Sequence, residues 1–142
     1  MLEHNSTLIL LDVSGNQMKG EGAAALADGL KSNSTVQQLR VNSNGLDADA
    51  GRLFLPIVDK SHFEVFDGIP IKQIRENTVT KLDLKGSKGK QLEACGGIVL
   101  AHVLTGNTSV HELDVSANGL GPDAGKAMAA SIADNSTITS VS

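Results

Sequence analysis

The chain has 142 residues, of which 40% are apolar and 2% are aromatic, and its formal net charge is −4. This length suits one domain with a sizeable core, and the apolar content excludes a disordered tail. The acidic balance argues against nucleic acid or an anionic membrane surface as a partner. Three Phe without Trp or Tyr also provide no platform for stacking bases.

The cysteine content and the hydropathy pattern bear on the compartment. A single cysteine, Cys95, excludes an internal disulfide and fits a reducing environment. No segment approaches the roughly 18 apolar residues of a membrane span. The N-terminal residues also lack the basic segment of a signal peptide. We therefore expect a cytoplasmic protein.

A short polar triplet repeats along the chain. Asn5-Ser6-Thr7 recurs 28 residues later as Asn33-Ser34-Thr35, and Asn107-Thr108-Ser109 recurs after the same interval as Asn135-Ser136-Thr137. A weaker copy begins at Asn77. Each triplet precedes a phrase whose apolar residues alternate, as they do in a strand with one buried face. These phrases read LILLDVSGN, VQQLRVNSN, VTKLDLKGS, VHELDVSAN and ITSVS.

A second phrase, rich in small and apolar residues at helical spacing, follows each of the four longer strand phrases. Ala23, Ala27 and Leu30 share one stripe of the first such phrase. Each repeat therefore predicts a strand, a turn, a helix and a second turn. One such unit does not bury its apolar face alone, whereas stacked units form a continuous core.

The phrase L-x-x-L-D-V-S-x-N-x-L/M, followed by G-x-x-A-x-x-L, resembles the leucine-rich-repeat consensus over residues 5–60 and 77–142. The repeat length is similar to that of the ribonuclease-inhibitor subtype. The resemblance implies an α/β solenoid, with a parallel concave sheet of five or six short strands and convex helices. The turn asparagine of the family matches Asn16, Asn44 and Asn118. Ser87 takes that place in the Leu82 repeat, whose turn is three residues longer, so we expect different bonding there.

The middle of the chain interrupts the period, because 43 residues separate Leu39 from Leu82. Phe63 and Phe66 reproduce the spacing of an earlier strand, which predicts a strand around 63–67 and a shortened return through Pro70. We expect a single repeat domain over residues 1–142. Its parts are regular repeats at 5–60, a degenerate or truncated repeat at 61–76 and repeats at 77–142, the last one truncated.

Two interpretations of Phe63 and Phe66 stay open at this point. In the first, which the pattern favours, the two rings fill a core gap left by a missing helix. In the second, they belong to a protruding loop that contacts a partner. The exposure of the two rings decides between these interpretations.

The concave strand face is the predicted interaction site, because stacked repeats commonly bind there. No column of this face is uniformly basic, acidic or aromatic, so we expect a protein partner of unspecified identity; the competing interpretation is a solvated face without a partner. The candidate protein-binding residues are Gln38, Arg40, Asn42, Lys81, Asp83, Lys85, Glu112 and Asp114. Aspartates are common at this consensus position, which weakens a catalytic role for them.

Other motifs have simpler structural interpretations. The sequons at Asn5, Asn33, Asn107 and Asn135 share one repeat phase, which favours turn residues over glycan acceptors. The histidines show no metal spacing. Cys95 and His102 share a helical face, but a structural thiol is the favoured interpretation. Residues 86–90 lack the phosphate-loop spacing, although Lys85, Lys88 and Lys90 form a small basic cluster.

We expect no catalytic residue, no cofactor and no metal. The predicted function is a non-enzymatic protein–protein interaction module, or scaffold. The alternative is a structural subunit of a cytoskeletal or other large assembly that docks through its solenoid ends. Apolar side chains at Leu8, Leu10, Ile138 and Val141 would be exposed at those ends. Either the chain is a fragment of a longer repeat protein, or self-association or a partner covers its ends.

Overall fold

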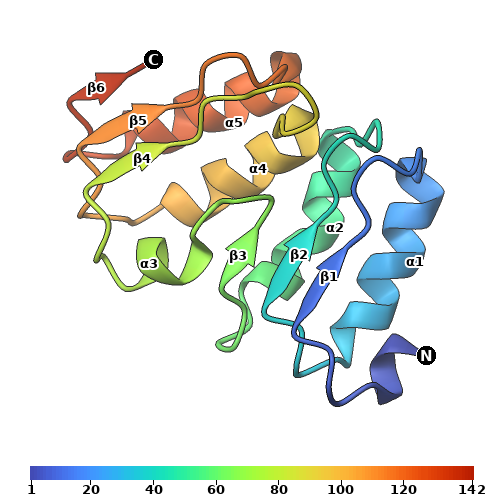
Figure 1. Cartoon of the computed structure of the whole chain (residues 1–142). Helices are drawn as coiled ribbons and strands as arrows, with labels where there is room; N and C mark the ends of the chain where they lie inside the picture. The colour runs from blue at the N-terminus through green and yellow to red at the C-terminus, as the bar shows by residue number, and fades with distance from the viewer.

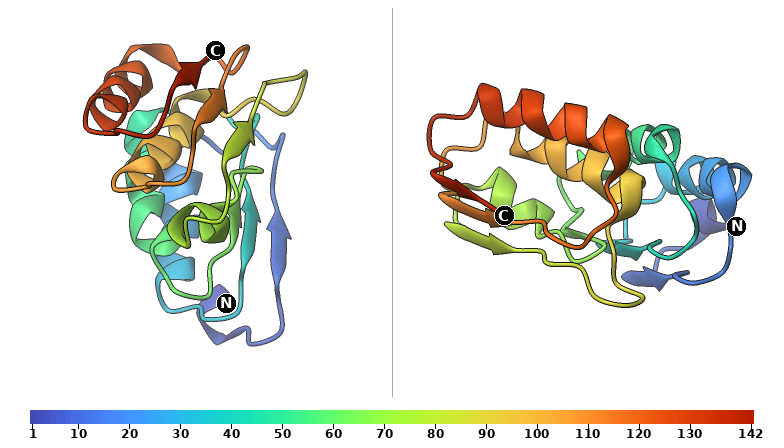
Figure 2. Two further views of the ribbon diagram at one scale, coloured as in Figure 1. Left: turned by 90° about the vertical axis from the view of Figure 1, so that its left-hand side faces the viewer. Right: turned by 90° about the horizontal axis from the view of Figure 1, so that it is seen from above.

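The computed structural model describes residues 1–142. Short parallel strands form one layer and helices form the other (Figures 1 and 2). This arrangement confirms the predicted fold class. The strands are β1 Leu10–Asp12, β2 Gln38–Arg40, β3 Val65–Phe66, β4 Lys81–Asp83, β5 Glu112–Asp114 and β6 Ser140–Val141. The helices are η1 Leu2–His4, α1 Lys19–Lys31, α2 Ala48–Val58, α3 Ile71–Arg75, α4 Glu93–Leu104 and α5 Gly121–Ala133.

The strand layer is divided into two sheets. Strands β1, β2 and β3 pair in that order, and so do β4, β5 and β6, but β3 does not pair with β4. Leu11 aligns with Leu39, and Leu39 with Phe66, in the first sheet. Leu82 aligns with Leu113 in the second. The predicted single sheet is therefore two sheets that run in different directions (Figure 1).

A tight turn at Asp67–Gly68 explains the division. Both residues have positive φ, 47° and 84°, and Phe66 and Ile69 exchange backbone hydrogen bonds of 3.1 and 2.7 Å. Two successive positive φ values define a type I′ turn, which Asp-Gly favours. The N–H of Phe66 points away from β2 and is used by the turn, while the carbonyl of Glu64 accepts a bond from Lys72. The outer edge of β3 is thus closed to β4.

The helix layer is continuous where the strand layer is not. Because α3 has only five residues, α2 packs directly against α4, and α4 packs against α5. Eight of the twelve residues of α4 are buried, as expected for a helix covered on several sides. Glycine allows the close approach, since a Cβ on Gly51 would lie 2.7 Å from the carbonyl oxygen of Cys95. A Cβ on Gly97 would lie 2.6 Å from the Cβ of Ala124.

The three phenylalanines belong to the core at the end of the first sheet. Phe54, Phe63 and Phe66 are fully buried, and the ring centroids of Phe54 and Phe66 lie 5.4 Å apart in a tilted arrangement. Phe63 and Phe66 therefore fill the core next to the truncated repeat and do not form a protruding loop.

One column of asparagines joins successive turns between strand and helix. Asn44 Nδ2 donates to the carbonyl of Val41 in its own repeat, over 2.7 Å, and to that of Val13 in the preceding repeat, over 2.9 Å. Its Oδ1 accepts from the N–H groups of Asn16 and Met18. Asn118 makes the equivalent bonds in the second sheet. These contacts confirm the predicted turn role of Asn44 and Asn118.

Two further positions complete this column. The side-chain amide of Asn16, at its outer end, donates only to carbonyls of its own repeat. At Ser87 the turn is bonded differently, as predicted, since Ser87 and Lys90 form a small antiparallel bridge. Asn118 of the next repeat still makes the usual bonds of the column to this repeat, to the carbonyl of Leu84 and from the N–H of Leu92.

A second column joins the turns between helix and strand. The Oδ1 atoms of Asn33, Asn107 and Asn135 each accept backbone N–H groups of the following residues. Their Nδ2 atoms donate to carbonyls of the preceding repeat. Asn33 is 2% exposed and Asn107 is 6% exposed, so the folded chain leaves no room for a glycan at either. The structure favours the turn interpretation of these sequons.

Basic side chains replace this asparagine in the irregular middle. Lys60 Nζ donates to the carbonyls of Leu30 and Asn33, over 2.9 and 2.8 Å, and Arg75 donates to that of Val58 over 2.7 Å. These carbonyls lie at or just beyond the C-termini of α1 and α2, where the helix dipole favours a cation. Burial lowers the pKa of Lys60.

We expect Gly51→Ala to lower the free energy of unfolding by about 1–3 kcal/mol, because the added methyl group overpacks the contact between α2 and α4. Gly125→Ala is the control: nothing lies within 4 Å of its position, and alanine in a helix should stabilise by about 0.5–1 kcal/mol. Urea unfolding measures both variants. Equal effects would show that α2 and α4 are not in close contact.

We expect Asn44→Ala to lower the free energy of unfolding by about 2–4 kcal/mol, because it leaves buried backbone groups of two repeats without partners. Asn16→Ala, at the outer end of the same column, should cost less than about 1 kcal/mol, because water replaces its lost bonds. Thermal and urea unfolding test the pair. A similar loss for both variants would contradict a role for the column in joining repeats.

Candidate functional site

The eight predicted interaction residues lie on or beside three strands. Gln38 and Arg40 belong to β2 and Asn42 lies two residues beyond its end, whereas the other five belong to β4, β5 and the turn after β4. The division of the strand layer therefore separates them into two groups. All are exposed or half-buried, and none belongs to the core.

Two ion pairs cross between neighbouring strands of this face. Arg40 Nη1 lies 3.5 Å from Asp12 Oδ2 in the first sheet, and Lys81 Nζ lies 2.6 Å from Glu112 Oε2 in the second. The hydrogen bond from Lys81 to Glu112, together with the charge of Glu112, raises the pKa of Lys81. Water and salt screen exposed pairs of this kind, so they contribute little to stability. A partner can therefore replace these ion pairs with little loss of folding stability.

The repeated aspartates have a local structural role. Asp12 Oδ1 accepts from the hydroxyl of Ser14 over 2.6 Å and from its N–H over 3.0 Å. Asp114 and Ser116 repeat these contacts over 2.6 and 2.9 Å. The serine hydroxyl and then the serine N–H hold the pKa of each carboxyl below its usual range. Each aspartate thus fixes the chain as it leaves its strand.

A shallow hollow lies on the strand face of the second sheet. It has a volume of about 220 Å³ and is lined by charged side chains of β4 and β5, with Leu82 and Leu113 among its other lining residues. Ser140 and Ser142 complete its wall. The charged lining side chains are Lys81, Asp83, Glu112 and Asp114. The structure thus brings four of the eight predicted residues together.

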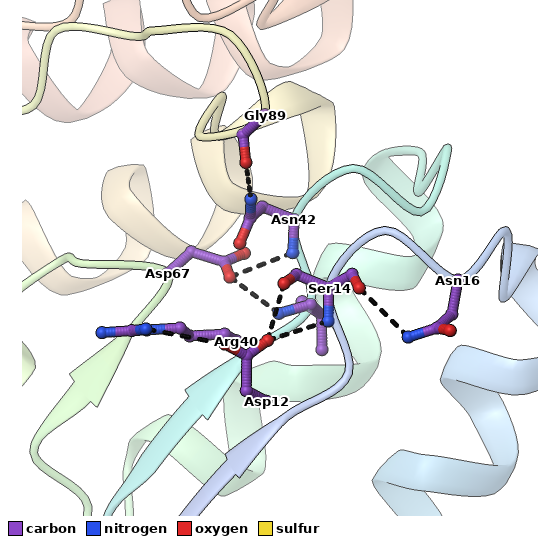
Figure 3. Close-up of polar contacts among 8 residues, drawn as sticks. Asp12, Ser14, Asn16, Arg40, Asn42, Asp67 and Gly89 are labelled. Carbon is purple, nitrogen blue, oxygen red and sulfur yellow. Dashed lines mark hydrogen bonds and ion pairs between the residues drawn. The ribbon is translucent and has the colours of Figure 1, made fainter.

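Asn42 has an internal role that the sequence did not reveal. Its Nδ2 donates to the carbonyl of Gly89 over 2.6 Å, so it connects the first sheet to the turn after β4 (Figure 3). Asp67 Oδ1 accepts from the N–H groups of Val41 and Asn42 over 2.7 and 3.1 Å. Burial raises the pKa of Asp67 to about 6, against the lowering effect of these two bonds.

Asp67 was not among the predicted residues, although a signal for its turn exists. The Asp-Gly pair lies between apolar residues in the segment Phe66-Asp67-Gly68-Ile69, which is a strong signal for a two-residue turn.

A groove of about 390 Å³ lies on the helix side, where α3 is too short to complete the helix layer. Val58, Ile71 and Ile74 supply apolar walls. At its rim His102 Nε2 lies 2.8 Å from Asp59 Oδ1, which joins α4 to the end of α2. The sequence did not predict this groove, because it depends on the direct contact between α2 and α4.

Cys95 is buried, and burial is the main cause that raises the pKa of its thiol. A thiol in this environment is a poor nucleophile, and His102 bonds Asp59 rather than Cys95. No group of three or more His, Cys, Asp or Glu side chains is arranged to hold a metal ion. No helix is long and apolar enough to cross a bilayer.

Comparison with known proteins supports the repeat assignment. Residues 4–27 and 106–129 match the family model described as Leucine Rich repeat. Protein CARMIL of Dictyostelium discoideum is 26% identical over 133 residues, which cover 94% of this chain and 12% of that protein. The Rho GTPase-activating protein gacW of the same organism is 27% identical over 120 residues, which cover 83% of this chain and 11% of that protein. The chain thus spans only a small part of these relatives.

Among solved structures, the tropomodulin C-terminal domain of Caenorhabditis elegans is 13% identical, with a TM-score of 0.46, and the match covers 98% of this chain and 75% of that one. The two segments matched by the family model each begin next to an asparagine triplet and run into the following helix. They therefore share one phase of the strand, turn and helix repeat seen in the structure. Residues 4–27 and 106–129 are thus leucine-rich repeats.

Proposed function

We propose that this protein is a non-enzymatic interaction module, or scaffold, that binds a protein partner with its strand face. The observation that carries the proposal is the mixed charge of that face on a fixed backbone. Side chains of both signs stand on β2, β4 and β5, and the asparagine columns hold the turns at the strand ends. A fixed backbone reduces the entropy that binding costs. Stacked repeats offer extended surfaces of this kind.

The size and chemistry of the face suit a modest protein interface. Each sheet has three strands, which at a spacing of about 4.8 Å span roughly 10 Å, so the two sheets together suit an interface at the small end of the specific range. Alternating charges favour a protein surface with its own mixed charge over nucleic acid. We also propose a cytoplasmic location, supported by the lone buried thiol of Cys95 and by the buried sequon at Asn33.

Charge reversal on the strand face tests the proposal. A pull-down from the native extract identifies a partner, and titration of that partner then measures affinity. We expect Arg40→Glu and Glu112→Lys each to weaken binding about tenfold or more, because each places a like charge opposite the partner. The fold should persist, because both pairs are exposed.

Helix α2 offers a matched control. Arg52 pairs with Asp49, and the side chains of Arg40 and Arg52 are both 54% exposed. Arg52→Glu therefore reverses the same charge on the helix side and should leave binding within about twofold of the parent protein. Equal losses for Arg40→Glu and Arg52→Glu, or no loss for either strand-face variant, would reject the strand face as the interface.

A second candidate function is docking into a larger assembly through the solenoid ends. Its support is the exposure of Ile9 and Leu10 beside the outer edge of β1 and of Val141 on β6, at 45%, 42% and 48%. Exposed apolar residues on an unpaired strand edge favour pairing with another chain.

Sedimentation velocity across a hundredfold range of concentration tests the second candidate. Self-association through the ends predicts a sedimentation coefficient that rises with concentration and a weaker rise for Leu10→Lys, which adds a charge to the edge of β1. A constant monomer value for the parent protein would count against end-to-end association. It would leave the strand-face proposal intact.

A further inference from the structure

The junction between the two sheets is held by few polar contacts. Only two side-chain hydrogen bonds join residues 1–69 to residues 78–142: Asn42 to the carbonyl of Gly89, and His102 to Asp59. The first lies on the strand side and the second on the helix side. Apolar packing of α2 against α4 supplies the rest of the connection. The strand side of the junction therefore depends on the position of Asn42.

Asp67 fixes that position. Its Oδ1 accepts from the N–H groups of Val41 and Asn42, the two residues that follow β2 at the junction (Figure 3). Its Oδ2 is buried and has no hydrogen-bond partner. A buried carboxylate oxygen without a partner is costly when it carries charge and much less costly when the carboxyl is neutral.

The charges that act on Asp67 are acidic. The negative charges of Glu93 on α4 and Asp12 on β1 both raise the pKa of Asp67, and Arg40 forms its ion pair with Asp12. The negative charges of Asp67, Glu93 and Asp47 also raise the pKa of Cys95 on α4. Lys88 and Lys90 flank Gly89, whose carbonyl Asn42 contacts. The charged and titratable groups around the junction are Asp12, Arg40, Asp47, Lys88, Lys90, Glu93 and Cys95.

We propose that Asp67 is a proton-controlled latch on the strand face: the neutral carboxyl holds β2 and the turn after β4 together, and its ionisation releases them. Release frees the N–H groups of Val41 and Asn42 and breaks the bond from Asn42 to Gly89. The packing of α2 against α4 remains as the pivot. The two halves of the strand face then lose their fixed relation to each other.

The direction of the effect follows from proton linkage. Burial raises the pKa of Asp67 from 3.8 in the open chain to about 6 in the closed junction. The closed junction therefore binds the proton more tightly than the open one. The resulting stabilisation of the closed junction is complete at pH values below the pKa that Asp67 has in the open junction. That advantage is lost as the pH rises through the closed pKa. The junction is therefore held most strongly in mildly acidic solution and less strongly near neutrality.

Amide hydrogen exchange followed by NMR tests the latch. Between pH 4.5 and pH 7.5, the protection factors of the Val41 and Asn42 amides should fall roughly ten- to thirtyfold, after correction for the intrinsic exchange rate. The Leu84 and Gly86 amides bond backbone carbonyls in the second sheet and should change less than about twofold. A flat profile at Val41 and Asn42 would overturn the proposal.

Asp67→Asn supplies the matched variant, because its side-chain oxygen still accepts from both N–H groups but does not titrate. Its Val41 and Asn42 amides should show no pH dependence over the same range, and an unchanged dependence would also overturn the proposal. If this variant does not fold, the carboxyl resonance of Asp67 in the parent protein gives a second readout. Its titration midpoint should coincide with that of the Gly89 amide shift, and separate midpoints would reject the latch.

Discussion

The turn at Asp67–Gly68 is the constraint on which the arrangement of the whole chain depends. Positive φ at two successive residues reverses the chain after β3, and the reversal uses the N–H that another strand would have needed. The strand layer ends there and resumes at β4. The carboxyl group of Asp67 then accepts from the N–H groups of Val41 and Asn42 just after β2, which would otherwise be left without partners.

The helix layer bridges the break because the shortened repeat leaves no long helix between α2 and α4. Glycine at Gly51 and Gly97 lets the three neighbouring helices approach closely, and α4 becomes the buried centre of the layer. Where the repeat is distorted, a fixed asparagine no longer reaches the preceding helix end. The longer side chains of Lys60 and Arg75 reach those carbonyls instead, with a charge that suits a helix C-terminus.

The sequence predicted the features that recur at a constant interval. Asn44 and Asn118 cap the turns, and Phe63 and Phe66 lie in the core, because the repeat phase alone places them. The two sheets, the helix-side groove and the roles of Lys60, Arg75 and Asp67 depend on contacts between segments at other intervals. Arg75 and Val58, for example, are bonded across 17 residues rather than 28. The assignment of the strand face as an interface stays a prediction, and Asn42, one of its candidates, is held inside the junction.

Nuclear Overhauser contacts across the junction test the broken strand layer most directly. We expect contacts between α2 and α4 near Gly51 and Cys95, and between the side-chain amide of Asn42 and Gly89. We expect no contacts from backbone to backbone between β3 and β4. Regular N–H to Hα contacts between Phe66 and Leu82, as in an unbroken parallel sheet, would contradict the division into two sheets.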